Sequence, residues 1–478
     1  MVGRKKEIEE LNKLYNSKKA ELIAIYGRRR IGKTYLVDET FKGHITFRHA
    51  GLSPADENKK GMLKAQLEHF FYSLKLHGMR NSKKPGSWLE AFFMLEKYLE
   101  EIDDGSRQLV FLDELPWLDT PRSGFMTAFE GFWNTWGCHR DNLMVVVCGS
   151  ANSWILDKLV NNHGGLYNRV TYEIKLLPFT LKECEEFFES KNVKLSRYDI
   201  AQSYMILGGV PYYMGYFQSG QSLAQNIDNI FFAKQAKLRD EYDRLFASIF
   251  SNPEVMKGIV KLLYTRNAGY TRSEILERTA IQDGGSFSQS INALIASDFV
   301  MKYVPFGKGK KEHYKLVDPF CLFYLHFVEK KKELDENFWM NNMSSQQVIS
   351  WRGFAYENIC FNHISQIKRA LGISGVITKQ SAWSKKGNDE EGTQIDLLIF
   401  RNDNVVNMCE IKYYSDTFVV NKEYYKVILH RQELLTKEIS PKVSIHNTLI
   451  TTFGLNYNEY SGIFANTVTL DDLFEMGS

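Results

Sequence analysis

The sequence contains no apolar stretch long enough to cross a membrane, and its N-terminus lacks the apolar core of a secretion signal. Its six cysteines are scattered along the chain and form no C-x-x-C pair. This scatter argues against a structural zinc site and is typical of proteins of the reducing cytoplasm. The net charge is only +3, so any contact with nucleic acid must come from a local patch. We therefore expect a cytoplasmic protein without a membrane partner.

The composition is that of a globular chain. Apolar residues make up 44% and aromatic residues 14% of the 478 residues, which excludes a disordered protein. The length allows about two to four domains with cores of their own. We find no internal repeat and no low-complexity tract.

Residues 27–34, GRRRIGKT, fit the phosphate-binding pattern G-x-x-x-x-G-K-[ST]. The apolar run 21–26 precedes them and a helix start follows, and this order favours a phosphate-binding loop over a basic surface turn. Glycine lets the backbone wrap around phosphates, so that N–H groups face the anion. Lys33 would meet the β- and γ-phosphates of ATP, and the Thr34 hydroxyl would bind Mg²⁺. The predicted nucleotide-contacting residues of the loop are Gly27, Arg30, Gly32, Lys33 and Thr34.

A second apolar run, residues 108–114, ends in two carboxylates. Asp113 would hold the Mg²⁺ ion, directly or through water, and Glu114 would polarise the water that attacks ATP. The alternative is a solvated strand end, which is less favoured because the phosphate-binding loop is also present.

Two further residues could complete the nucleotide site. Asn152 follows the apolar strand 143–150 and could orient water beside the γ-phosphate, or it could be a plain turn residue. Arg169 is a candidate arginine finger, acting in cis or from a neighbouring subunit, and the alternative is a surface arginine in an ion pair. Whether the chain forms a homo-oligomer therefore stays open.

The first half of the chain divides into two patterns. Residues 1–176 alternate apolar strands with helices, which predicts a mostly parallel sheet covered by helices. Residues 177–250 lack strand alternation and predict a helical lid on the nucleotide. Pro211 stands at a helix entry within this segment, where proline is tolerated.

The strings GRRRIGKT, FLDE, CGS, LYNR and GGVPYYM occur in this order along the chain. With them the sequence resembles the prokaryotic AAA+-like and STAND-like P-loop ATPases. In particular, it resembles an archaeal-type ATPase family that carries a C-terminal nuclease-like domain. The resemblance implies that Pro211 lies against the adenine.

Residues 251–330 form a third block, in which three short helices precede two strands joined by a basic, glycine-rich tip. Three helices and a hairpin predict a winged helix-turn-helix domain that contacts a DNA backbone. The candidate DNA contacts are Lys308, Lys310 and Lys311 at the tip and Ser286, Ser288 and Gln289 at the start of the third helix. The alternative is a spacer that serves only as a packing platform.

The last block, residues 331–478, contains a second candidate site. A long helix is predicted over 345–371, and Glu357 falls on its apolar stripe between Phe354 and Phe361. A carboxylate on a core-facing stripe is costly unless it is paired or bound to a metal ion.

Two predicted strands follow this helix. Asp396 lies near the start of the first, and Glu410 and Lys412 share one face of the second. A helix glutamate, a strand aspartate and an E-x-K strand resemble the PD-(D/E)xK nuclease superfamily, although Ile395 stands where proline often precedes the aspartate.

The resemblance implies that Asp396 and Glu410 bind a divalent metal ion with help from Glu357. Lys412 would position the attacking water or stabilise the phosphorane, and Gln394 would help to orient the site. Carboxylate ligands suit Mg²⁺ or Mn²⁺ rather than zinc. A nuclease fold that only binds DNA or protein is the alternative.

The sequence thus predicts an α/β protein with four parts: a parallel-sheet P-loop ATPase, a helical lid, a winged helix-turn-helix domain and a restriction-endonuclease-like domain. We expect it to hydrolyse ATP and to couple nucleotide state to metal-dependent DNA cleavage, in DNA processing or defence. Two alternatives remain. One is an ATP-driven signalling scaffold with an inactive nuclease fold, and the other is a transcriptional regulator that reads DNA with its winged helix.

Overall fold

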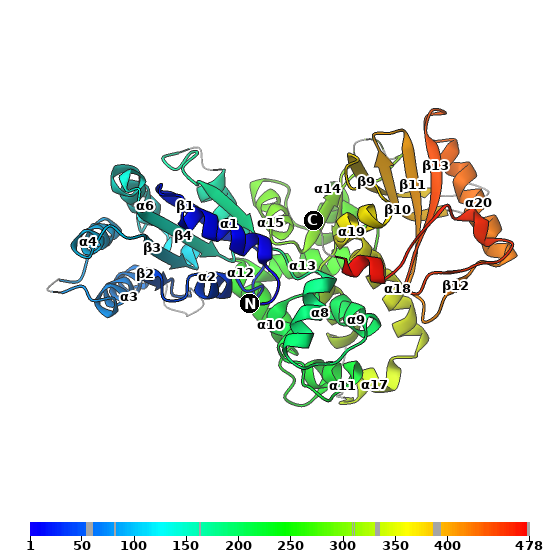
Figure 1. The fold of residues 1–478 in the computed structure, drawn as a ribbon, viewed down its shortest axis with the longest axis horizontal. Coiled ribbons are helices and arrows are strands. Elements are labelled where there is room, and N and C mark those ends of the chain that lie inside the picture. Colours follow the sequence, from blue (N-terminus) through cyan, green and yellow to red (C-terminus); the bar gives the residue numbers. More distant parts are fainter. Residues whose placement is uncertain are drawn as a thin grey trace. The chain divides into compact units, whose positions relative to one another are not determined.

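The structure is a computed structural model of the chain (Figure 1), and it describes residues 1–53, 61–80, 83–161, 164–307, 309, 311–329, 335–385 and 393–475. The chain divides into two compact units. The P-loop unit comprises Met1–Pro178, Asp243–Met256 and Ser288–Asp298, and the C-terminal unit comprises Phe179–Tyr242, Lys257–Phe287 and Phe299–Ser478. Residues 179–242, most of the predicted lid, belong to the C-terminal unit. The division into four domains stays a prediction.

The P-loop unit is built on a five-stranded parallel sheet with the strand order β2-β3-β4-β1-β5. The strands are β1 (Glu21–Tyr26), β2 (Ile45–Ala50), β3 (Gln108–Asp113), β4 (Leu143–Gly149) and β5 (Tyr172–Lys175). The parallel sheet predicted from the apolar runs is confirmed. Strands β1, β3 and β4 are buried at every residue, as a parallel sheet with helices on both faces requires.

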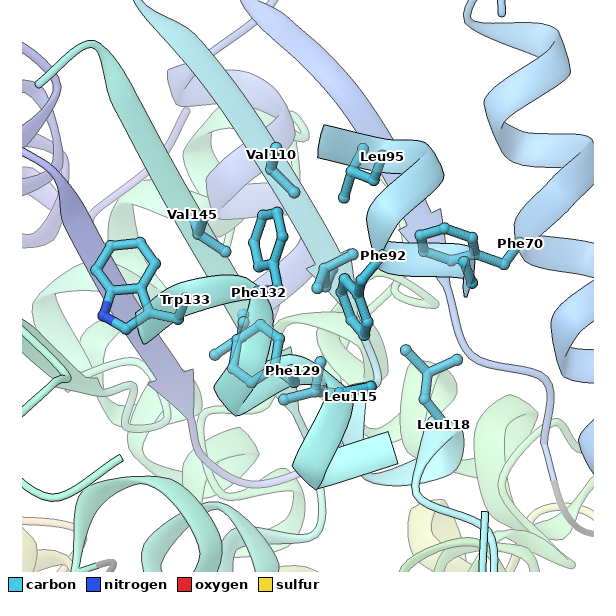
Figure 2. Close-up of a cluster of buried hydrophobic side chains, with 14 of the residues drawn as sticks. Phe70, Phe92, Leu95, Val110, Leu115, Leu118, Phe129, Phe132, Trp133 and Val145 are labelled. Carbon is cyan, nitrogen blue, oxygen red and sulfur yellow. The ribbon is translucent and has the colours of Figure 1, made fainter. Parts of the chain in front are cut away.

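Helices cover both faces of this sheet (Figure 1). One face packs against α1 (Lys5–Tyr15) and α2 (Lys33–Thr40), and the other against α3 (Met62–Leu76), α4 (Trp88–Glu101) and α6 (Phe125–Gly131). Figure 2 shows the core on the face covered by α3, α4 and α6, where Phe92 of α4 lies among Phe129, Phe132 and Leu95, and the sheet residues Val110 and Val145 belong to the same cluster. The unit also contains α5 (Leu115–Leu118) and α7 (Asn152–Ile155), and most of α12 (Glu241–Ile249) and α15 (Gly285–Ala296).

The strand order determines which loops meet. In a parallel sheet all carboxyl ends lie at one edge, and β4 lies between β1 and β3. The loops that begin at Gly27, Glu114 and Ser150 therefore follow three neighbouring strand ends.

The C-terminal unit begins with a helical part. It consists of α8 (Leu181–Ser190), α9 (Arg197–Leu207), α10 (Pro211–Met214), α11 (Leu223–Ile227), α16 (Pro319–Phe323) and α17 (Phe338–Asn342). Thr180 and Glu183 form a capping box at the start of α8, so two local side chains determine where this helix begins. Helix α9 packs against α8, α16 and α18 (Gln346–Asn362).

The predicted third block forms helices and a small antiparallel sheet. The helices are α13 (Pro253–Tyr264), α14 (Arg272–Thr279) and α15, and the strands are β6 (Tyr270–Thr271), β7 (Val300–Tyr303) and β8 (His313–Leu316), in the order β6-β8-β7. Lys308 and Lys310 of the predicted tip lie outside the described residues, and Lys311 is exposed.

The last part of the unit is a five-stranded mixed sheet in the order β15-β13-β11-β10-β9 (Figure 1). Its strands are β9 (Thr378–Lys385), β10 (Thr393–Arg401), β11 (Val405–Lys412), β13 (Ser444–Thr451) and β15 (Asn466–Val468), and β12 (Phe418–Val419) pairs separately with β14 (Leu455–Asn456). Helix α20 (Lys422–Thr436) packs on one face through Ile428 and Leu435.

The long helix predicted over 345–371 is two helices, α18 and α19 (Ile364–Ala370), which meet at His363. The predicted apolar stripe is wrong in part, because Phe354 is 54% exposed. The face of α18 that carries Trp351, Tyr356 and Ile359 is buried instead, and Glu357 is buried beside it.

The six cysteines are all free. None of the helices in the described ranges has the length and apolar character that a membrane crossing needs.

Candidate functional site

The phosphate-binding motif forms the turn between β1 and α2. Gly27 has φ of 149°, and a Cβ there would lie 2.2 Å from the carbonyl oxygen of Leu176, so only glycine fits. Arg30 and Gly32 also have positive φ values, 72° and 89°. The loop therefore curls over the N-terminus of α2, where backbone N–H groups can face a phosphate.

Lys33 is buried within this loop. Its ammonium donates hydrogen bonds to the carbonyl oxygens of Gly27 (2.9 Å) and Arg28 (3.0 Å). Burial lowers the pKa of Lys33, although the carboxylates of Glu114 and Asp113 act in the opposite direction. A phosphate bound in the loop would favour the charged ammonium.

Thr34 and Asp113 lie side by side, and the Thr34 hydroxyl donates to Oδ2 of Asp113 at 2.8 Å. Burial raises the pKa of Asp113, and the bond from Thr34 opposes this shift. A hydroxyl and a carboxylate at one point are the oxygen ligands that Mg²⁺ prefers. The two residues fit the predicted magnesium site.

Glu114 is held at the end of the neighbouring strand β4. Its carboxylate accepts hydrogen bonds from the backbone N–H of Ser150 (3.1 Å) and from the Ser150 hydroxyl (2.9 Å). Its backbone is left-handed, with φ of 46°, a costly conformation for a residue that is not glycine.

Asn152 lies beneath the loop. Its side-chain oxygen accepts from the N–H of Gly27 (2.8 Å), and its amide nitrogen donates to the carbonyl of Ala296 in α15 (2.9 Å). Both polar atoms are thus bonded to backbone, so Asn152 holds the loop in place. Its contact with the γ-phosphate stays a prediction.

Arg169 and Pro211 take no part in the hydrogen bonds described above. The Arg169 side chain is exposed and forms no ion pair with the residues that the structure describes, and Pro211 is the first residue of α10 in the C-terminal unit. Their roles as arginine finger and adenine contact stay predictions.

The C-terminal unit brings together the four residues of the second candidate site. Glu357 comes from α18, Asp396 from β10, and Glu410 and Lys412 from β11. The antiparallel register pairs Leu397 with Cys409, which sets Asp396 opposite Glu410 one step further. Lys412 Nζ lies 2.9 Å from Oε1 of Glu410, so these two residues share a face as the E-x-K pattern predicts.

Glu410 is buried and surrounded by donors. Its carboxylate binds Lys412, and it also accepts hydrogen bonds from the Tyr424 hydroxyl and the Arg431 guanidinium, both on α20. Burial alone would raise the pKa of Glu410, but the two cations outweigh it and the net shift is downward. Glu410 is therefore ionised and fully paired.

Glu357 and Asp396 carry charge that is less well compensated. Burial and the charge of Asp396 raise the pKa of Glu357 to about 7, and burial and the charge of Glu410 raise that of Asp396 to about 6. A divalent cation would relieve this repulsion, so the oxygen donors fit Mg²⁺ or Mn²⁺. Within the described ranges, however, no three Asp, Glu, His or Cys side chains converge on one point, and Glu410 faces its own three donors.

Glu357 and Asp396 open into a cavity of about 530 Å³. Its other walls come from the hairpin β7–β8, the edge strand β9 and the end of α18. Lys315 of β8 lines the same cavity, is only 7% exposed, and has its Nζ 5.5 Å from the centre of the Phe361 ring.

Residues 1–217 match the family model of an ATPase domain found predominantly in Archaea. The N-terminal part of the chain is an ATPase domain of this archaeal type. The phosphate-binding loop, Thr34 and Asp113 all lie within the matched residues, and their contacts with a nucleotide stay predictions.

Two proteins of Methanocaldococcus jannaschii are similar to the chain. An uncharacterized protein is 23% identical over 444 residues, which cover 91% of this chain and 92% of that protein. An uncharacterized ATP-binding protein is 56% identical over 36 residues, 8% of this chain and 61% of that protein.

The chain also has looser similarity to solved structures. A Walker-type ATPase of Pyrococcus abyssi is 16% identical, with a TM-score of 0.45, over 68% of this chain and 96% of that one. The ORC2 protein of Aeropyrum pernix, in a complex with ADPNP and ADP, is 14% identical, with a TM-score of 0.40, over 68% and 93%.

Three residues of the second site were not predicted from the sequence. Tyr424 and Arg431 are seven residues apart on α20, two helical turns, so they share a face, but nothing in the sequence says that this face meets Glu410. Lys315 carries one weak signal, since it is a charged residue within a short predicted strand, β8, which the structure shows to be buried.

Proposed function

We propose that the chain is an ATP-hydrolysing protein in which nucleotide state controls a metal-dependent DNA nuclease-like domain, with a role in DNA processing or defence. The single observation that carries the nuclease part is the meeting of Glu357, Asp396, Glu410 and Lys412 from three separate elements. Residues 251–330 would act as a winged helix-turn-helix domain and residues 331–478 as the nuclease-like domain.

The nuclease part rests on the chemistry of the four side chains. Asp396 and Glu357 would hold a divalent ion, with Glu410 joining them by exchanging one of its present donors, and Gln394 lies 3.3 Å from Asp396 to orient it. A bound Mg²⁺ or Mn²⁺ ion would supply charge to a phosphodiester and activate water. Lys412 would keep a positive charge next to the phosphate oxygens.

The coupling rests on how the helical segment 179–242 is anchored. The buried N–H of Leu181, at the start of α8, donates to the His363 ring at 3.1 Å. His363 joins α18, which carries Glu357, to α19. Tyr198 of α9 stacks on Tyr413, the residue after Lys412, with ring centres 4.9 Å apart. A movement of this helical segment would therefore displace His363 and Tyr413, and with them the elements that carry Glu357 and Lys412.

The hairpin β7–β8 is the element proposed to contact DNA outside the carboxylate site. Beyond β7 the hairpin continues along β9, because Phe306 N–H donates to the carbonyl of Ala382 (3.1 Å) and the Ser381 hydroxyl donates to that of Val304 (3.0 Å). These bonds favour a packing platform, whereas exposed Lys311 favours a contact with DNA.

The test incubates the protein with supercoiled and linear DNA, with Mg²⁺ or Mn²⁺, and with or without ATP. We expect cleavage by the wild type, loss of cleavage in Lys412→Ala, and no change in Lys437→Ala, a matched exposed lysine of the same unit. Failure of an ATP-hydrolysing wild type to cleave with either metal would contradict the nuclease.

The coupling has a separate test. Lys33→Ala should abolish nucleotide binding and make DNA cleavage indifferent to ATP, with Lys19→Ala as the control. DNA cleavage in Lys33→Ala that still equals the ATP-loaded wild type would refute the coupling but not the nuclease.

A second candidate is an ATP-driven scaffold with an inactive nuclease fold. The full pairing of Glu410 with Lys412, Tyr424 and Arg431 favours it, since a metal ion would have to compete with these donors. Retained DNA binding without cleavage would support this candidate, and protection of one specific sequence would instead support a transcriptional regulator.

A further inference from the structure

Lys315 is a buried lysine to which the proposed function gives no role. It lies on β8, in the middle of the chain, yet it lines the cavity that exposes Glu357 and Asp396. Within the part of the chain that the structure describes, its side chain forms no hydrogen bond and no ion pair, and its ammonium lies over the face of the Phe361 ring.

This position holds the Lys315 side chain largely away from water. An ammonium removed from water without a partner costs free energy, and burial accordingly lowers the pKa of Lys315. The charges of Glu357 and Asp396 offset this only in part, and neither carboxylate forms an ion pair with the lysine.

The charge balance of the site indicates what the ligand is. Three carboxylates (Glu357, Asp396 and Glu410) stand against three cations (Lys315, Lys412 and Arg431). The divalent ion of the proposed function would leave this cluster with excess positive charge. The cluster would then attract an anion, and Lys315 is the cation without a protein partner among the described residues.

The cavity suits one nucleotide of a strand. Its volume of about 530 Å³ lies within the roughly 300–1,000 Å³ of small-ligand sites. Its walls include the aromatic rings of Tyr303 and Phe361 and the amides of Asn358 and Gln380, groups that contact a base or sugar.

We propose that Lys315 binds a phosphate group of a DNA strand held at the carboxylate cluster, so that the hairpin β7–β8 supplies part of the substrate site. This inference rests on the proposed nuclease function, because it names the residue that recognises the substrate's phosphate. The contact proposed for Lys315 differs from the predicted contact of the hairpin tip with DNA, since Lys315 lies at the opposite, buried end of β8.

The test measures binding of short fluorescent DNA, single-stranded and duplex, in Ca²⁺ to prevent cleavage and over a range of salt concentrations. It compares the wild type with Lys315→Met, Lys315→Arg and the control Lys368→Met, a half-buried lysine that donates to the carbonyl of Val376 at 2.8 Å. ATP hydrolysis, which none of these residues serves, checks that each variant is folded.

We expect Lys315→Met to weaken DNA binding by about 10-fold or more, as for one charge-assisted hydrogen bond. The slope of log K against log salt should fall by about 0.7 to 0.9, as for one phosphate contact. Lys315→Arg should restore most of the binding, and the melting temperature of Lys315→Met should be equal to or above that of the wild type, because a buried charge is removed.

Unchanged affinity and salt slope in Lys315→Met would overturn the inference while leaving the nuclease proposal intact. Equal loss of stability and of binding in both Lys315 variants would also overturn it, because the lysine would then be structural. A wild type that hydrolyses ATP but binds no DNA would overturn the proposed function and this inference together.

Discussion

The Glu114 carboxylate accepts one hydrogen bond from the backbone N–H of Ser150 at 3.1 Å and another from the Ser150 hydroxyl at 2.9 Å. Glu114 and Ser150 directly follow the neighbouring strands β3 and β4, so the bond exists only because these strands pair in parallel. The orientation of the predicted water-polarising group is thus set by a serine on the adjacent strand.

Removing the Ser150 hydroxyl should impair ATP hydrolysis without affecting ATP binding. Hydrogen bonds to a charged group contribute about 1.5–3 kcal/mol, so Ser150→Ala should lower kcat about 10-fold or more and leave KM for ATP unchanged. Steady-state ATP hydrolysis checks this, with Ser153→Ala as the control. An increase in kcat would show instead that Ser150 holds Glu114 away from the attacking water.

Gly27→Ala should destabilise the P-loop unit. The added Cβ would lie 2.2 Å from the Leu176 carbonyl oxygen, at a φ that disfavours alanine, so we expect a loss of about 2 kcal/mol or more and weaker ATP binding. Gly131→Ala is the matched control, because Gly131 has helical φ and open space, and there alanine should stabilise by about 0.5–1 kcal/mol. Urea unfolding measures the free energy of unfolding of both variants. Equal values would contradict the strain expected from a side chain at Gly27.

The metal-free protein should lose stability as the pH rises from about 4 to about 7. In the folded state the pKa of Glu357 is raised from 4.5 to about 7 and that of Asp396 from 3.8 to about 6. The folded state therefore binds more protons than the unfolded state in this range, so the free energy of unfolding falls with rising pH. Each group contributes on the order of 3 kcal/mol.

Asp396→Asn should remove part of this dependence, and unfolding in urea at a series of pH values measures it. Addition of Mn²⁺ should reverse the trend, since a cation stabilises the ionised carboxylates at high pH. An Asp396→Asn profile that parallels the wild type would contradict the charge repulsion inferred at this cluster.

His363 should add an acid-sensitive term of opposite sign. Burial lowers its pKa from 6.5 to about 4, so it stays neutral in the folded state while the unfolded chain takes up a proton. Its contribution to stability is therefore lost as the pH falls from 6.5 toward 4. His363→Leu should weaken this loss and, at pH 7, cost about 1–3 kcal/mol because the Leu181 N–H loses its acceptor. Thermal unfolding at a series of pH values measures both effects, with His430→Leu as the control. Equal pH dependence in the two variants would contradict this role of His363.

The sheet of the P-loop unit could be predicted because β1, β3 and β4 are short continuous apolar runs, which is how buried parallel strands appear in a sequence. The grouping of the lid could not be predicted. Helix α9 is buried from Ile200 to Leu207. Its apolar residues predict that the helix packs against other elements, but they do not predict that these elements are α16 and α18. The break at His363 was also missed, because no proline or glycine marks it.

The candidate sites show the same limit. Thr34 with Asp113, and Glu410 with Lys412, could be predicted because a short motif fixes each partner's place on its loop or strand. Asn152 could not be placed, since its bonds to Gly27 and Ala296 depend on how the chain packs beneath the loop. Lys315, Tyr424 and Arg431 reach their cluster from elements without any motif, and only tertiary structure brings them there.

The backbone hydrogen bond between Phe306 and Ala382 determines where the chain can be divided into fragments that fold. A fragment that begins at the predicted boundary of residue 331 would lose Phe306, which packs against the core of the C-terminal sheet, and would leave β9 as a bare edge open to self-association. Such a fragment would aggregate for reasons unrelated to its activity, so a negative result from it would be uninformative. A fragment that keeps the hairpin from Phe299 onward retains that edge pairing.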